Sequence, residues 1–449
     1  MGLGANSRKL AAIVAVAVIL VAAIGVYQIY KPRAKPEETT IKIGIVAPTT
    51  GGMSKTGRDM WQAAQLAAKE INEAGGVYVE SLGKNLTIKL YLGDTESSPE
   101  GGIAAVTKLI VEDGVHVLVG GFSSAVTMAD EVVAIEHGIP FIVTGASTPQ
   151  VTRRTDYDTS NIFHHIATAD VFGWRVMVWA AEQLRPKLIE ELGLPSDYRL
   201  KGGIFYQDTF YGIGAYEGAI NAIEKLDLPI DIVYAEKYPM LTTDFSSFIP
   251  GMLEQKLDFL YWVGFLGETA AGIAQARAAG VNTLFIAVEC CDDPDYYRLL
   301  GEWGDFSLLH SRWSTYNVPL APNYERIQRF KEAYQEMWGE LPGMMGVATY
   351  EGVYVAAEAI RRAGSLDSEA IIKALDELRM PQICNIIEGG YIDYTEDYRE
   401  LPIMHFMQQL YFDESIGECR ARVIYPEEWS NPPGAELELP DWYVEYLRG

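Results

Sequence analysis

Histidine and cysteine are scarce in this chain, with six histidines and four cysteines among 449 residues. The cysteines follow none of the spacings that zinc sites use, and the histidines are not spaced as metal ligands. His164 and His165 are adjacent in an extended segment, so we expect their side chains on opposite faces and in structural roles. The sequence therefore predicts no metal site.

Sequence motifs of catalysis are also missing. No phosphate-binding loop of the Gly-Lys-Ser/Thr type is present, and Gly212-Ile213-Gly214 matches a dinucleotide-binding fingerprint only in part. Gly121–Ala125 is similar to a nucleophile elbow, but alanine replaces the final glycine, and serine caps at a helix start explain this segment more simply. We expect neither an enzyme nor a cofactor. An exported serine hydrolase built around Ser123 is a remote alternative.

Basic residues are few relative to acidic ones, 36 against 61, which gives a formal net charge of −25. Such a negative field repels nucleic acid and anionic lipid surfaces, so we expect neither as a partner. The simplest use of this acidic surface is solubility.

The N-terminal segment is apolar. Arg8 and Lys9 precede an uncharged stretch from Leu10 to Tyr30, which is long enough for a membrane-spanning helix. Residues 1–30 are predicted to be a membrane anchor and residues 31–40 a linker, and the alternative is a signal cleaved near Val21-Ala22-Ala23. Either way, we expect the remainder of the chain outside the cytoplasm.

Export of the chain would allow disulfide formation by the four cysteines and glycosylation of one asparagine. Cys384 and Cys419 could form a disulfide in an oxidising compartment, and buried free thiols are the equal alternative for these and for Cys290 and Cys291. Asn85-Leu86-Thr87 matches a glycosylation acceptor, a triplet that arises often by chance.

Short apolar runs alternate with helical patterns from residue 41 onward, which is typical of parallel sheets covered by helices on both faces. Two such series occur, and later extended runs complete sheets begun earlier. We predict an α/β protein of two doubly wound parallel-sheet lobes joined by a multi-crossing hinge, preceded by one N-terminal apolar helix. The predicted bounds are 41–166 with 315–385 for lobe I, 167–314 with 386–425 for lobe II, and 426–449 for a C-terminal surface tail.

Polar side chains follow several predicted strands, at the sheet edge where ligands of doubly wound folds bind. Ser124 opens a helix, whose first N–H groups suit a carboxylate, and Ala146-Ser147 follows the next strand. Glu289 ends a largely apolar strand in the second series, a position that suits an ammonium group. Tyr211 and Phe265 would supply aromatic walls. Together these residues predict a site for a zwitterionic amino acid.

With these residues in view, the sequence resembles the solute-binding proteins of branched-chain amino acid ABC transporters, which have the type I periplasmic-binding-protein fold. The segments that carry the resemblance occur in order along residues 41–395. They are Ile41–Gly51, Gln65–Gly76, Asp94, Val119–Ser124, Ile139–Ser147, Tyr211-Gly212 and Phe259–Phe265.

The resemblance implies roles for individual residues. Ser124 matches the serine that binds the ligand carboxylate, and Ala146 and Ser147 match the small pair that completes this site. Glu289 falls where the family has the acid that meets the ammonium group, and Tyr211 matches an aromatic of the second lobe.

Two positions depart from the family pattern. Thr56 stands where relatives often carry an aromatic residue over the ligand, and Phe265 stands where a tyrosine is common. The pocket for the ligand's side chain is therefore expected to differ in shape from that of the relatives.

The function implied by the resemblance is solute capture by hinge closure, with an aliphatic amino acid as ligand and an ABC permease with its ATPase as partners. The alternative within the same fold is a ligand sensor that binds an amide, urea or a small carboxylate.

Overall fold

The computed structural model describes residues 39–448, so the predicted anchor at residues 1–30 and most of the predicted linker lie outside the described residues. Within the described part, no helix has both the length and the apolar character needed to cross a bilayer.

The first sheet has the strand order β2-β3-β1-β4-β5-β6 and is parallel except for β2. Its strands and the helices between them follow one another along the chain. They are β1 (Thr40–Ala47), α2 (Ser54–Glu73), β2 (Val77–Val79), β3 (Lys84–Asp94), α3 (Pro99–Lys108), β4 (Val117–Gly120), α4 (Ser124–His137), β5 (Phe141–Val143), α5 (Gln150–Arg153) and β6 (Ile162–His164).

The second sheet has the order β15-β14-β11-β10-β9-β7-β8 and is parallel from β11 to β8, with β14 and β15 antiparallel at one edge. Its elements are α6 (Ala169–Trp179), α7 (Arg185–Leu192), β7 (Leu200–Gln207), α8 (Phe210–Leu226), β8 (Ile230–Tyr238), α9 (Ile249–Gln255), β9 (Phe259–Val263), α10 (Leu266–Ala278), β10 (Leu284–Ala287), α11 (Pro294–Leu300), β11 (Leu308–Ser311), β14 (Phe406–Asp413) and β15 (Glu418–Tyr425).

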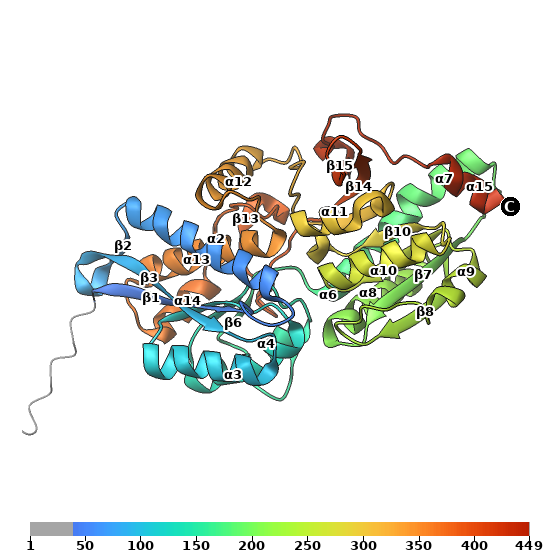
Figure 1. The fold of residues 1–449 in the computed structure, drawn as a ribbon. Coiled ribbons are helices and arrows are strands. Elements are labelled where there is room, and N and C mark those ends of the chain that lie inside the picture. The colour runs from blue at the N-terminus through green and yellow to red at the C-terminus, as the bar shows by residue number, and fades with distance from the viewer. Residues whose placement is uncertain (1–38, 449) are drawn as a thin grey trace, which may run out of the picture. The chain divides into compact units, whose positions relative to one another are not determined.

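Between β11 and β14 the chain returns to the first sheet, through α12 (Tyr324–Trp338), α13 (Met344–Ala363), α14 (Ser368–Asp376) and the short strands β12 (Met380–Pro381) and β13 (Tyr391–Ile392). Helix α13 packs against α2 and β4 (Figure 1). The chain therefore passes between the two sheets after β6, after β11 and after β13, which confirms the predicted fold class. The predicted lobe bounds stay a prediction.

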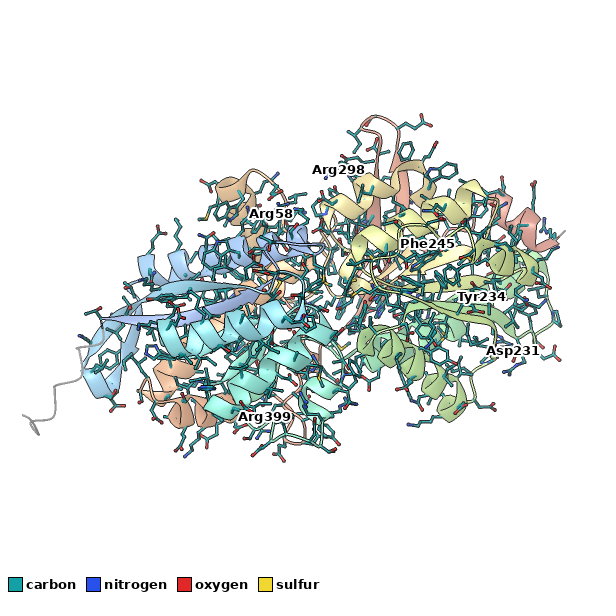
Figure 2. All side chains as sticks on the ribbon, turned by 60° about the horizontal axis from the view of Figure 1, so that its bottom comes forward. Arg58, Asp231, Tyr234, Phe245, Arg298 and Arg399 are labelled. Atoms are coloured by element: carbon teal, nitrogen blue, oxygen red, sulfur yellow. The ribbon has the colours of Figure 1, made fainter. Side chains whose placement is uncertain are left out.

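Burial explains why these elements form. All five residues of β9 are buried, as are all four of β4, so both strands lie in the interior of their sheets. Aromatic rings fill the space over the second sheet. Phe205 contacts Tyr238 and Trp262 with ring centroids 4.7 Å apart in each pair, and the Tyr234 and Phe245 labelled in Figure 2 pack against the same ring.

The C-terminal segment ends in helix α15 (Asp441–Arg448), whose Tyr443 is fully buried and donates a hydrogen bond to the Asp258 carbonyl at 2.7 Å. This short helix docks through one aromatic side chain, and the predicted bounds of the surface tail stay a prediction.

All four cysteines are free thiols in the structure, so the possible disulfide between Cys384 and Cys419 is wrong. Both are buried, and the Cys419 thiol donates to the Gly301 carbonyl at 3.0 Å. Asn85 is exposed on β3, and its glycosylation stays a prediction.

Candidate functional site

Two glycines set the direction of the chain after β4. Gly120 and Gly121 have φ of +130° and +76°, and a Cβ on Gly120 would lie 2.2 Å from the Val46 carbonyl oxygen. Only glycine fits such a position without strain. The chain therefore turns sharply out of the sheet and brings Phe122 and Ser124 to its edge.

Five of the predicted site residues line one cavity. Ser124 and Ser147 come from the first sheet, and Tyr211, Phe265 and Glu289 come from the second. This space, called here the cleft cavity, has a volume of about 10 Å³. Its other lining residues are Phe122, Gly145, Cys290 and Met345. The sequence prediction placed these residues in one site because ligands of doubly wound folds bind at the carboxyl ends of parallel strands.

The first-sheet wall of the cleft cavity presents hydroxyl groups. Ser124 is the first residue of α4, and its Oγ accepts a hydrogen bond from the Thr148 N–H at 3.2 Å. Ser123 occupies the N-cap position, but its hydroxyl makes no capping bond. The explanation of both serines as helix caps is therefore wrong. The Ser124 hydroxyl proton and the first-turn N–H groups of α4 can meet an anion here.

Ala146 does not line the cleft cavity. Its N–H donates to the Gly121 carbonyl at 3.0 Å, and its carbonyl oxygen lies 2.7 Å from His164 Nε2. Both backbone groups are thus used within the protein, and Ser147 alone of the predicted pair reaches the cavity.

The second-sheet wall carries a buried ion pair. Glu289 lies in a short 3-10 turn after β10, is 1% exposed, and its Oε2 accepts from Arg312 Nε at 3.1 Å. Arg312 also donates to Asn385 Oδ1 at 2.7 Å. Burial raises the pKa of Glu289, and the Arg312 guanidinium opposes this rise. The carboxylate predicted to receive an ammonium group already has a cation beside it.

Aromatic rings close the cleft cavity. Phe122 and Phe265 approach each other from the two sheets with centroids 5.2 Å apart, and Tyr211 stacks on Phe265 at 6.0 Å. The Tyr211 hydroxyl lies 3.5 Å from Cys290 Sγ. Phe265 occupies the N-cap position of α10, two residues after strand β9 ends at Val263.

A larger cavity of about 380 Å³ adjoins the cleft cavity and shares Phe122, Phe265 and Cys290 with it. We call it the outer cavity. Thr56 lines the outer cavity. This predicted residue therefore lies on the other side of the Phe122 and Phe265 rings from the Ser124 and Glu289 side chains. Lys55 and the 241–243 segment complete the wall. The absence of a large side chain at Thr56 leaves this space open.

Beneath Lys55 lie two buried carboxyl groups that the sequence prediction missed. Asp59 of α2 accepts from the Tyr334 hydroxyl at 2.9 Å and the Gly346 N–H at 2.6 Å. Burial, and then the charge of Asp293, raise the pKa of Asp59 to about 7. Asp293 caps α11, and burial raises its pKa to about 6. Nothing in the local sequence around Asp293 indicates that it lies near a carboxyl group of α2.

The neighbouring Asp292 is fully buried and accepts from the Tyr297 hydroxyl at 2.8 Å and the Ser311 hydroxyl at 2.9 Å. Among residues 39–448, no cluster of three or more His, Cys, Asp or Glu side chains could hold a metal ion.

The comparisons with known proteins agree with this geometry. The family described as periplasmic binding protein matches residues 40–399. The Leu/Ile/Val-binding protein homolog 1 of Brucella suis is 26% identical over 337 residues, which cover 75% of this chain and 82% of the relative.

Two solved structures show the same fold. The branched-chain amino acid transporter substrate-binding protein of Streptococcus pneumoniae, solved with isoleucine, has a TM-score of 0.70 at 20% identity and covers 86% of this chain and 100% of its own. A solute-binding protein of Rhodopseudomonas palustris, solved with 3,4-dihydroxybenzoic acid, has a TM-score of 0.70 at 22% identity and covers 85% of this chain and 95% of its own.

The family match confirms the resemblance found in the sequence. Its members are extracytoplasmic binding proteins rather than enzymes, which agrees with the prediction for this chain. On the match over residues 40–399, the chain belongs to the periplasmic binding protein family.

Proposed function

We propose that this chain is the solute-binding component of an ABC importer and captures an amino acid with an aliphatic side chain. The observation that carries the proposal is that Ser124 and Ser147 from one sheet and Glu289 from the other line a single cavity. The serine side would bind the ligand carboxylate, and Glu289 would bind its ammonium group. Relatives that match the same segments carry Leu/Ile/Val-binding names.

The size of the cleft cavity supports a closing motion. A volume of about 10 Å³ holds at most a water molecule, so an amino acid enters only when the two walls separate. The three chain passages between the sheets would act as the hinge. Closure would bring Glu289 and Tyr211 onto a ligand already bound at Ser124, and the permease with its ATPase would accept the closed form.

The N-terminal segment belongs to the same proposal. An uncleaved helix at residues 1–30 would hold the binding domain at the outer face of the cell membrane. Fractionation of cells that express the full chain tests this: an anchored protein stays with membranes after a salt wash, and a cleaved one is released.

A second candidate ligand follows from the Glu289–Arg312 pair. Because Arg312 already neutralises Glu289, the cavity also suits a carboxylate that has no ammonium group. A structural relative was solved with 3,4-dihydroxybenzoic acid, which is such a ligand.

Calorimetric titration of the full chain with leucine and with benzoate separates the two candidates. The amino-acid proposal expects heat from leucine that is lost in Glu289→Gln, and the second candidate expects benzoate binding that Glu289→Gln leaves unchanged and Ser124→Ala weakens. Mass spectrometry of ligand released from the denatured native protein provides an independent answer. Uptake by cells that carry the permease distinguishes an importer component from a sensor.

A further inference from the structure

A third cavity, of about 220 Å³, has His405 among its lining residues, and His405 Nε2 lies 3.7 Å from Glu289 Oε2. We call it the histidine cavity. Its lining residues are Arg175, Val178, Trp179, His310, Met404, His405, Phe406, Met407, Tyr425, Pro426, Glu428 and Trp429. Eight of these twelve lie beyond residue 399, where the family match ends.

A buried histidine without a hydrogen-bond partner lines this cavity. His310 of β11 is 2% exposed, and neither of its ring nitrogens forms a hydrogen bond. Its ring stacks on His405 at 4.7 Å, and Phe172 packs edge-on against both rings. A buried polar group without a partner costs free energy, which a polar group of a ligand would recover.

The wall beside the histidines is aromatic. Trp179 ends α6, Phe406 begins β14, and Tyr425 and Trp429 come from the end of β15 and the turn after it. Met404 and Met407 supply polarizable sulfur near these rings. Such walls favour a flat ring, and the volume accommodates one.

The charged residues that line the histidine cavity determine which aromatic compound can bind there. Arg175 of α6 is exposed and forms no ion pair within residues 39–448. Together with burial, its charge lowers the pKa of His405 to about 3, so this imidazole is neutral at physiological pH. Glu428 also lines the cavity and is exposed, which disfavours a ligand with a second carboxylate. A neutral imidazole and a free guanidinium together suit an acid with one polar substituent.

We propose that the histidine cavity is a second small-molecule site, which binds a single-ring aromatic monocarboxylic acid. The carboxylate would pair with Arg175, the ring would lie against Trp179 and Trp429, and a hydroxyl substituent would bond to His310.

The second site shares a wall with the first. His405 Nε2 lies 3.7 Å from Glu289 Oε2, and Glu289 lines the cleft cavity. A ligand that shifts the His310–His405 stack would therefore act on Glu289, and by linkage each ligand would change the affinity of the other by the same factor.

Calorimetric titration of the full chain with 4-hydroxybenzoate tests this proposal. We expect binding that persists in Ser124→Ala, falls tenfold or more in Arg175→Gln, and is unchanged in Arg329→Gln, where the arginine is exposed on α12. Benzoate, which lacks the hydroxyl, should bind about tenfold more weakly than 4-hydroxybenzoate.

The proposal is overturned if Arg175→Gln binds as the wild type does, if Ser124→Ala abolishes all binding, or if no binding occurs at millimolar 4-hydroxybenzoate. The proposed function is judged separately, by leucine binding in Glu289→Gln, because that titration involves only the cleft cavity. A wild-type 4-hydroxybenzoate isotherm with two sites, of which Arg175→Gln removes one, supports this proposal together with the carboxylate candidate for the cleft cavity.

Discussion

The two walls of the cleft cavity differ in how far their polar groups are already satisfied. The first-sheet wall presents Ser124 and Ser147, neutral hydroxyl groups beside the start of a helix. The second-sheet wall presents Glu289, whose charge is buried and paired with Arg312. The hydroxyl groups of the first wall can therefore bind an anion directly. On the second wall, the ligand has to compete with Arg312 for Glu289. Ligand specificity should therefore depend mainly on the second wall.

The largest expected effect is on stability, and it tests whether Arg312 is the counter-charge of the second wall. Arg312→Met leaves Glu289 buried without its partner, so the free energy of unfolding should fall by about 3–5 kcal/mol. Urea denaturation measures this. Arg329→Met, on an exposed face of α12, should stay within about 0.5 kcal/mol of the wild type. A similar value for the two variants would mean that Glu289 does not depend on Arg312.

The next effect concerns the ligand at the second wall. Glu289→Gln keeps the shape of the side chain and an acceptor for Arg312 but removes the negative charge. Leucine affinity should fall by about 2–5 kcal/mol in calorimetry if an ammonium group binds there. Benzoate affinity should not change. An unaltered leucine affinity would show that the internal ion pair excludes Glu289 from ligand binding.

A smaller effect is expected at the first wall. Ser124→Ala removes a hydroxyl that bonds to the Thr148 N–H and faces the cleft cavity, so affinity for any carboxylate ligand of this cavity should fall by about 1–3 kcal/mol. Ser123→Ala is the matched control, because the Ser123 hydroxyl makes no capping bond. Equal losses in both variants would mean that the helix start, and not Ser124, decides the affinity. Hydrolysis of an ester that Ser123→Ala abolishes would instead revive the hydrolase alternative.

The last comparison is a pH dependence of stability to which Asp59 on α2 and Asp293 at the start of α11 each contribute one carboxyl group. Asp59 has a pKa of about 7 when folded and 3.8 as its ordinary value. Between these pH values the folded state holds a proton that the unfolded chain has released, so this group makes stability fall as pH rises from about 4 to about 7.

Asp293→Asn sharpens this last comparison. Asparagine keeps the cap on the Asp295 N–H but removes the charge that raises the pKa of Asp59. If that pKa falls by about one unit, the stability lost over this pH range shrinks by about 1.4 kcal/mol, in addition to the change caused by losing the Asp293 carboxyl, whose own pKa is about 6. Urea denaturation at several pH values measures the pH dependence, and a change no larger than the loss of the Asp293 carboxyl by itself produces would show that burial alone raises the pKa of Asp59.

Local patterns were sufficient to predict most elements and part of the site. Helix α4 begins at Ser124 as predicted, and it ends at His137 because Gly138 follows with a φ of +63°. The convergence of Ser124 and Glu289 followed from sheet topology alone. The sequence did not indicate that the Ala146 N–H donates to the Gly121 carbonyl or that the Ala146 carbonyl oxygen lies 2.7 Å from His164 Nε2, because both partners come from other segments of the chain.

The sequence by itself determined the alternation of strands and helices, the two sheets and the sheet edge that carries the polar site residues. These features depend on the periodicity of the side chains and on glycine turns, which involve residues only a few positions apart. Only the tertiary structure decided that Glu289 pairs with Arg312, that Asp59 lies near Asp293, and that His310 and His405 stack beside a cavity. These pairs join residues far apart in the chain, and their contacts arise from the packing of whole elements, for which no local sequence signal exists.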